Sequence, residues 1–271
     1  MLKQAIDLPG VGNARELGGY AIGERRVKSG VLLRTAGLDR ATPEAMDALQ
    51  NRYRVKTVID FRMSDERTPL PDPAIPGAEN LHLPVLEQAD MLVDVDPSMI
   101  EKYTDPNVDR MELFSAAYET GMLDDQLYVR LLTSERGRAA FRGFFKALLA
   151  LEDERAILWH CTDGKDRTGC AAMLLLFALG ADRETVIRDY MLTNDYNAPR
   201  LSVLRQKIEP LGWPQAKAEA LLFMSGGVSE VYMNNGINAL VREYGTVEAY
   251  FARELDLGKE EREALSRKLL E

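Results

Sequence analysis

The sequence is poor in cysteine and histidine. Its 271 residues include two cysteines, Cys161 and Cys170, and two histidines, His82 and His160. Two cysteines so close together cannot frame a disulfide-stabilised secreted domain, and they fit a reducing compartment better. With so few histidines, a Ser-His-Asp catalytic site has no obvious source of its base.

Long hydrophobic runs and an excess of basic residues are also lacking. The longest apolar run, 171–181, falls short of the ~20 residues that a membrane crossing needs, so it predicts a buried helix. The first ten residues lack the apolar region of a signal peptide, and we expect a cytoplasmic protein without a membrane span. The net charge of −9 argues against nucleic-acid partners, so any anionic ligand must be bound locally.

The chain is long enough for one large domain, and no linker divides it. We expect a single domain over 1–271 with an α/β fold, a parallel-sheet core flanked by helices, and a helical C-terminal part. The elements read from the pattern are strands at 31–34, 56–61, 80–85 and 156–160, helices starting at Pro43, Arg138 and near Arg167, and a loop at 13–20. The stretch 87–132, Met-rich and helical in pattern, is interpreted as a helical lid insertion or, nearly as well, as a plain helical excursion.

The most informative segment is WHCTDGKDRTG, residues 159–169. It places Cys161 at the end of a buried strand, six residues before Arg167, which opens a helix. The backbone N–H groups of the loop, including those of Thr162, Asp163 and Gly164, can converge on a tetrahedral anion beside the positive end of the helix dipole. Arg167 can bind two oxygens of a phosphate at once, and the same positive field favours the thiolate form of Cys161.

This segment matches HCxxGxxR[ST]G, the signature loop of cysteine-dependent phosphatases. Its fuller form, HCxDGKDRTG, resembles a group of bacterial tyrosine/serine protein phosphatases that includes mycobacterial PtpB and Listeria LipA. Further stretches resemble motifs of that group in the same order: NARELGGY (13–20), LRTAGL (33–38), TVIDFR with Glu66-Arg67 (57–67), DYMLTN (189–194) and GTVEAY (245–250). Ala14 and Glu16 depart from the group's aromatic residue and aspartate.

The resemblance implies a cysteine-phosphatase-like fold, needing neither metal nor another cofactor, that acts on phosphorylated proteins and releases inorganic phosphate. It also implies activity on phosphoinositides, for which Lys165 would offer a second cation to additional phosphate groups. Asp163 adds a negative charge to the loop and opposes a highly anionic substrate.

We assign Cys161 as the nucleophile that forms a thiophosphate intermediate, and Arg167 as the clamp on the phosphoryl oxygens. Thr168 would hydrogen-bond the thiolate as it leaves. His160 is interpreted as a residue that holds the loop through backbone hydrogen bonds. Cys170 is interpreted as a buried helix thiol, with a disulfide to Cys161 as the less favoured alternative.

The leaving oxygen needs a proton from a nearby carboxylic acid. Asp166, inside the loop, is the favoured candidate, since the resembling group has an essential aspartate there. Asp60, at the end of a strand, is the second candidate, and its alternative role is to pair with Arg62 or Arg34. The leading hypothesis is therefore a cysteine-dependent phosphomonoesterase. A catalytically weak phosphate-binding module and a sulfurtransferase are the alternatives, and the sequence does not indicate an oligomeric state.

Overall fold

The computed structural model describes residues 4–91, 110–119 and 125–271. A five-stranded sheet lies at its centre, in the order β1-β4-β7-β5-β6. The bounds are β1 Arg15–Glu16, β4 Leu32–Thr35, β5 Val55–Asp60, β6 Glu79–His82 and β7 Ala156–His160. The last four run parallel, and β1 pairs antiparallel with β4 at one edge. A separate two-stranded sheet joins β2 (Ala21–Ile22) to β3 (Arg25–Arg26).

The central strand β7 is buried on both faces, as its uniformly apolar sequence predicts. Ile157 and Trp159 belong to the larger apolar core, whereas Ala156 and Leu158 belong to a smaller one on the opposite face. This alternation follows from the two-residue period of a strand.

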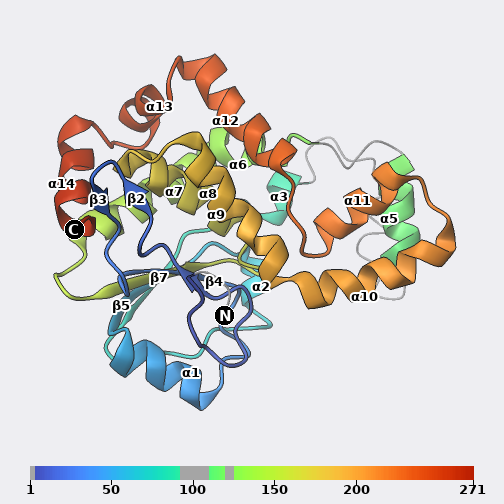
Figure 1. Ribbon diagram of the computed structural model, residues 1–271, viewed down its shortest axis with the longest axis horizontal. Helices are drawn as coiled ribbons and strands as arrows, with labels where there is room; N and C mark the ends of the chain where they lie inside the picture. The colour runs from blue at the N-terminus through green and yellow to red at the C-terminus, as the bar shows by residue number, and fades with distance from the viewer. Residues whose placement is uncertain (1–3, 92–109, 120–124) are drawn as a thin grey trace.

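The smaller core is covered by α1 (Pro43–Asp47), which continues as a π-helical turn over Ala48–Arg52. The Thr42 side chain accepts a hydrogen bond from the Ala45 N–H and caps α1, as predicted. On the other side of the sheet lies a thick helical layer (Figure 1). Its members are α6 (Leu127–Thr133), α7 (Glu135–Ala150), α8 (Asp166–Leu179), α9 (Arg183–Tyr196), α12 (Glu230–Tyr244), α13 (Val247–Glu254) and α14 (Lys259–Leu269).

Three further helices form a separate lobe at one end of the molecule: α5 (Arg110–Glu119), α10 (Ala198–Ile208) and α11 (Gln215–Met224) (Figure 1). Phe114, Ile208 and Leu221 form the apolar centre of this lobe. The remaining short helices are α2 (Ser64–Arg67), α3 (Gln88–Met91) and the 3-10 turn Glu209–Leu211. None of the helices among the described residues has the length and apolar character to cross a membrane.

The four parallel strands and the main helices agree with the sequence-based expectations to within a few residues, and the parallel core with its helical C-terminal part is confirmed. The short strands β2 and β3 were not predicted. The prediction that 13–20 is entirely loop was wrong. Arg15 and Glu16 form β1 opposite Arg34 and Leu33, a strand too short to leave a pattern in the sequence. Of the stretch 87–132, part lies outside the described residues. The described part is helical, and α6 within it packs into the large core.

Candidate active site

The site lies where the parallel strands end. His160 is the last residue of β7, the loop 161–165 follows, and α8 begins at Asp166. Thr35 and Asp60, the last residues of β4 and β5, pair with His160 on its two sides. The carboxyl ends of parallel strands face the ligand-binding crevice in α/β proteins, so the signature loop stands where the topology favours a site.

The loop is held so that its carbonyl groups point outward. Each carbonyl of residues 161–165 accepts a hydrogen bond. The Cys161 carbonyl accepts from His160 Nδ1 (3.3 Å), that of Thr162 from the Gly37 N–H (3.2 Å), and that of Asp163 from Asn13 Nδ2 (3.2 Å). The Gly164 carbonyl accepts from both Asn13 Nδ2 (2.9 Å) and Arg34 Nη2 (3.1 Å), and that of Lys165 accepts from the Gly169 N–H (2.8 Å). None of the N–H groups of residues 162–165 donates to another group in the described part of the chain. With its carbonyls fixed outward, the loop turns successive N–H groups inward, which is the arrangement that binds an oxyanion.

Gly164 is required in this loop for two reasons. Its φ is +67°, a conformation that residues with a side chain rarely adopt. A Cβ at this position would also lie 2.4 Å from the Thr35 carbonyl oxygen.

A buried ionic group supports the loop from behind. The carboxylate of Asp189 on α9 accepts hydrogen bonds from Arg34 Nη1, from Arg15 Nε at 3.4 Å and from the Tyr20 hydroxyl at 3.2 Å. Arg15 in turn donates to the Asn13 side chain. Burial alone would raise the pKa of Asp189, but Arg34 and Arg15 hold that pKa below its ordinary value. Burial and the charge of Arg34 lower the pKa of Arg15 to about 10.

Two guanidinium groups thus face one carboxylate, and the buried group keeps a net positive charge. Arg34 brings this charge directly to the loop, since it binds both Asp189 and the Gly164 carbonyl. A positive charge at low dielectric stabilises a nearby thiolate or phosphate.

Cys161 directly follows β7, and Arg167 is the second residue of α8. The Cys161 side chain is buried, with 1% of the residue exposed. Arg167 points both terminal nitrogens at Glu66, with 2.9 Å from Nη2 to Oε1. Glu66 also accepts from the Thr162 hydroxyl at 2.5 Å and from the Met63 N–H at 2.8 Å. Glu66 therefore fixes the plane of the Arg167 guanidinium. The remaining N–H groups of Arg167 are thereby held in a defined direction by the protein.

The charges of this pair reinforce each other. Burial alone would raise the pKa of Glu66, but the hydrogen bonds and the charge of Arg167 lower that pKa to about 2. Burial likewise opposes the charged form of Arg167, but Glu66 and Cys161 raise the pKa of Arg167 above its ordinary value. Sequence reasoning did not assign Glu66 a role. The signal was present in the Glu66-Arg67 pair of the resembling motif, but its distance of 101 positions from Arg167 hides the contact.

The two candidate acids have different surroundings. Asp166 Oδ1 accepts from the Tyr128 hydroxyl at 2.7 Å, and Oδ2 lies 3.6 Å from Lys165 Nζ. Asp60 accepts from Arg62 Nε at 3.0 and 3.2 Å, from Nη2 at 2.9 Å and from the Arg62 N–H at 2.9 Å. Every oxygen of Asp60 is thus bound by Arg62, which corresponds to the alternative role weighed for it.

Two charged residues of the loop, Asp163 and Lys165, contact the end lobe. Lys165 Nζ donates to the carbonyls of Phe223 and Gly227, and it stands 4.6 Å from the centre of the Phe223 ring. Asp163 accepts from Arg200 Nη1 at 2.9 Å. The structure therefore places the Lys165 charge against α11, where backbone carbonyls satisfy it.

Two further loop neighbours, Thr168 and Cys170, are buried on α8. The Thr168 hydroxyl has no hydrogen-bond partner within the described residues, which leaves it available to the sulfur or the substrate. Cys170 is a free thiol, and burial raises its pKa well above the ordinary value. This agrees with its interpretation as a buried helix thiol.

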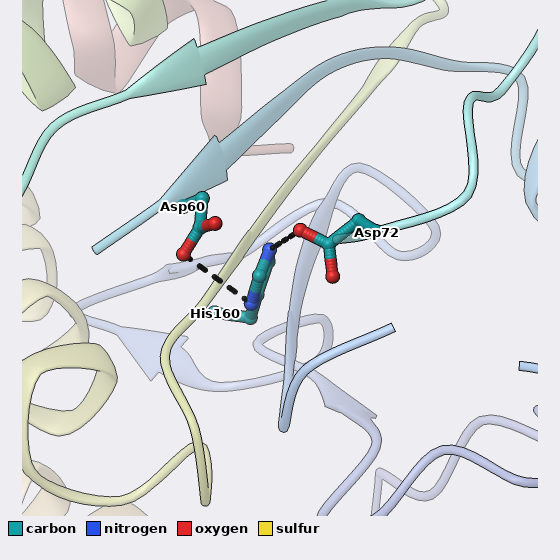
Figure 2. A group of neighbouring side chains, drawn as sticks. All are labelled: Asp60, Asp72 and His160. Atoms are coloured by element: carbon teal, nitrogen blue, oxygen red, sulfur yellow. Dashed lines mark ion pairs between the residues drawn. The ribbon is translucent and has the colours of Figure 1, made fainter. Parts of the chain in front are cut away.

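His160 lies between two carboxylates, as Figure 2 shows. Its Nε2 is 3.1 Å from Asp72 Oδ2 and its Nδ1 is 3.9 Å from Asp60 Oδ1. This group has the donors of a metal site, and its ligand atoms lie within 4.8 Å of one another. However, Arg62 Nη2 binds both Asp60, at 2.9 Å, and Asp72, at 2.7 Å. Since Arg62 already occupies oxygens of both carboxylates, the group is better suited to holding His160 against the loop than to binding a cation.

An anion-binding loop at the end of a central parallel strand, a cysteine at its start and a fixed arginine at its end define a cysteine-dependent phosphatase. Comparisons with known proteins agree. The sequence model of the tyrosine phosphatase family matches residues 6–271, so the chain belongs to that family.

A protein of Cupriavidus necator, named as a candidate tyrosine-protein phosphatase, is 31% identical over 91% of this chain and 82% of its own. The triple specificity protein phosphatase PtpB of Mycobacterium tuberculosis is 26% identical over 90% of this chain and 91% of its own. A tyrosine-protein phosphatase of Nostoc commune is 28% identical over 63% of this chain and 50% of its own. The chain is therefore a cysteine-dependent protein tyrosine phosphatase, a hydrolase that releases phosphate from a phosphorylated substrate.

Proposed function

We propose that Cys161 is the nucleophile of a two-step hydrolysis of phosphotyrosine in proteins. In the first step the Cys161 sulfur attacks phosphorus, the bond to the tyrosine oxygen breaks, and Asp166 gives that oxygen its proton. In the second step water attacks the thiophosphate, Asp166 takes a proton from it, and the sulfur leaves as a thiolate. The outward carbonyls of residues 161–165 carry this proposal, because they leave the loop N–H groups to stabilise the phosphoryl oxygens.

Arg167 is the second stabilising group for the phosphoryl oxygens, positioned by Glu66. The Thr168 hydroxyl would donate to the sulfur as it leaves, which is consistent with its lack of another partner in the described residues. The hydroxyl of Thr162 is bound to Glu66, so Thr162, like Asp163 and Gly164, would contribute its backbone N–H.

The acid assignment can be tested with a matched pair of variants. Asp166→Asn should lower kcat/KM for a phosphotyrosine peptide by about 10²-fold or more, within the range of general acid catalysis. Asp60→Asn makes the same isosteric change at the second candidate. Because Arg62 already binds both oxygens of Asp60, we expect a much smaller loss of kcat/KM in this variant. A larger loss in Asp60→Asn than in Asp166→Asn would reverse the assignment.

The nucleophile is tested by Cys161→Ser. This variant should lose turnover of an aryl phosphate, assayed without added metal, and retain measurable vanadate binding. Turnover close to that of the wild type would refute the mechanism.

The substrate range extends, in our proposal, from phosphotyrosine to phosphoserine and phosphothreonine, with phosphoinositides as weaker substrates. The name of the mycobacterial relative supports a broad range. A nucleophile that is 1% exposed favours phosphotyrosine, whose phosphorus stands further from the peptide backbone than that of phosphoserine. Lys165, the residue expected to bind extra phosphates, has its ammonium held by Phe223 and Gly227 carbonyls. Parallel assays with phosphotyrosine peptide, phosphoserine peptide and a phosphatidylinositol phosphate should give rates that decrease in that order.

We also propose that residues 1–271 form one phosphatase domain. The chain end supports this, since the Glu271 N–H donates to the Arg26 carbonyl at 2.9 Å and Leu270 forms a bridge with Val27.

A further inference from the structure

A chain of buried hydroxyl groups leads from the helical core to Asp166. The Tyr190 hydroxyl on α9 donates to the Tyr128 hydroxyl on α6 at 2.8 Å, and Tyr128 donates to Asp166 Oδ1 at 2.7 Å. Both tyrosines are almost completely buried, with 0% of Tyr128 and 1% of Tyr190 exposed. Packing of the core alone does not require the Tyr128 hydroxyl to lie on the carboxylate of the candidate acid.

The packing around these tyrosines fixes them in place. The two rings meet edge to face with 5.7 Å between their centres, and Tyr232 packs edge to face on Tyr128 at 6.2 Å. Gly236 on α12 allows α6 to approach closely, since a Cβ there would lie 3.1 Å from the Tyr128 Cβ. Gly169, the last glycine of the signature motif, leaves room for the Tyr190 ring, which a Cβ would approach to 3.3 Å.

We propose that Tyr128 is a positioning residue for the general acid, which rests on the role proposed above for Asp166. Because Oδ1 accepts the Tyr128 hydrogen, the acidic proton of Asp166 is carried on Oδ2. This is the oxygen near Lys165, and it belongs to a side chain that is 20% exposed. Tyr128 thus selects the oxygen that gives the proton to the tyrosine leaving group and takes one from water in the second step.

The sensitivity to the leaving group separates this role from a purely structural one. A general acid matters most for a poor leaving group, such as the phenol of phenyl phosphate, and least for a good one, such as dinitrophenol. The value of kcat/KM reports the step in which the leaving group departs, so it is the quantity to compare. A structural defect would lower kcat/KM for both substrates by the same factor.

Tyr128→Phe keeps the ring and removes the hydroxyl. We expect kcat/KM for phenyl phosphate to fall about 5- to 30-fold, with a change of less than about 2-fold for dinitrophenyl phosphate. Tyr190→Phe leaves the Tyr128 donor in place and should show a weaker effect in the same direction.

Tyr250→Phe is the matched control. Tyr250 is also buried, and its hydroxyl donates to the Leu132 carbonyl at 2.7 Å without touching Asp166. Its loss should affect thermal stability and leave the ratio of the two substrates unchanged.

The outcomes distinguish this proposal from the one on which it rests. Equal losses for both substrates in Tyr128→Phe, or no loss, would overturn the positioning role while Asp166→Asn still shows the selective loss. If Asp166→Asn lacks that selectivity, the acid assignment itself fails. In the double variant Tyr128→Phe/Asp166→Asn, the tyrosine change should have no further selective effect, since the group it positions is gone.

Discussion

Replacing Glu66 by glutamine should show how much the carboxylate charge of Glu66 contributes to the free energy of unfolding and to the position of Arg167. The pKa of Glu66 is lowered from 4.5 to about 2 by its hydrogen bonds to Arg167, against the opposing effect of burial. Because each unit of pKa is worth about 1.4 kcal/mol, this lowering of the Glu66 pKa corresponds to about 3 kcal/mol of stability at neutral pH. The glutamine variant keeps the shape of the side chain and loses the charge.

The effect should depend on pH in a definite direction. A carboxyl group whose pKa is lowered on folding stabilises the folded state at pH values above 4.5, and this contribution disappears as the pH falls toward 2. Urea unfolding of the wild type and Glu66→Gln should therefore differ by about 3 kcal/mol at pH 7 and by roughly half of that at pH 3. The variant should also lose about 10-fold or more in kcat/KM, since the Arg167 fork loses its support.

Glu87→Gln is a suitable control. Glu87 accepts exposed hydrogen bonds from the Ser64 N–H and hydroxyl, and its loss should change the free energy of unfolding by less than about 0.5 kcal/mol. A Glu66→Gln difference that stays constant from pH 7 to pH 3 would show that the carboxylate charge is not what holds Arg167.

Three further predictions concern the loop. Asn13→Ala removes the donor to two loop carbonyls and should weaken vanadate binding by about 10-fold or more, measured by inhibition; unchanged inhibition would mean that the loop holds its shape without Asn13. Gly164→Ala should destabilise the protein by about 1–3 kcal/mol in thermal unfolding and abolish turnover, because of its positive φ and the approach to Thr35; a stable, active variant would contradict the loop geometry. Arg200→Ala breaks an exposed ion pair with Asp163 and should change kcat/KM for phosphotyrosine peptide by less than about 2-fold, whereas a large loss would show that Arg200 binds substrate.

The sequence was informative where chemistry depends on neighbouring residues. The order strand, Cys161, loop, Arg167 and helix is local, and the structure reproduces it with β7 ending at His160 and α8 starting at Asp166. The apolar run of β7 likewise predicted a central strand, since a parallel strand that is buried on both faces is rich in apolar residues.

The parts that sequence reasoning missed depend on contacts between distant positions. Arg15 and Asp189 are 174 positions apart, and neither belongs to a local pattern that announces an ion pair. The direction of Lys165 is decided by the carbonyls of Phe223 and Gly227, which only the packing of α11 brings into reach. Tyr128 was one residue in a long segment with mixed polarity, and its contact with Asp166 arises only after α6 packs beside α8.

The proposed mechanism requires an intermediate in which a phosphoryl group is bound to the Cys161 sulfur. Rapid acid quench of the wild-type enzyme with an excess of dinitrophenyl phosphate, followed by mass spectrometry of the digested protein, should find one phosphoryl group on the peptide that contains Cys161 and none on the Cys170 side of a cleavage between them. A phosphoryl group on another residue, or turnover without any labelled peptide, would contradict the account.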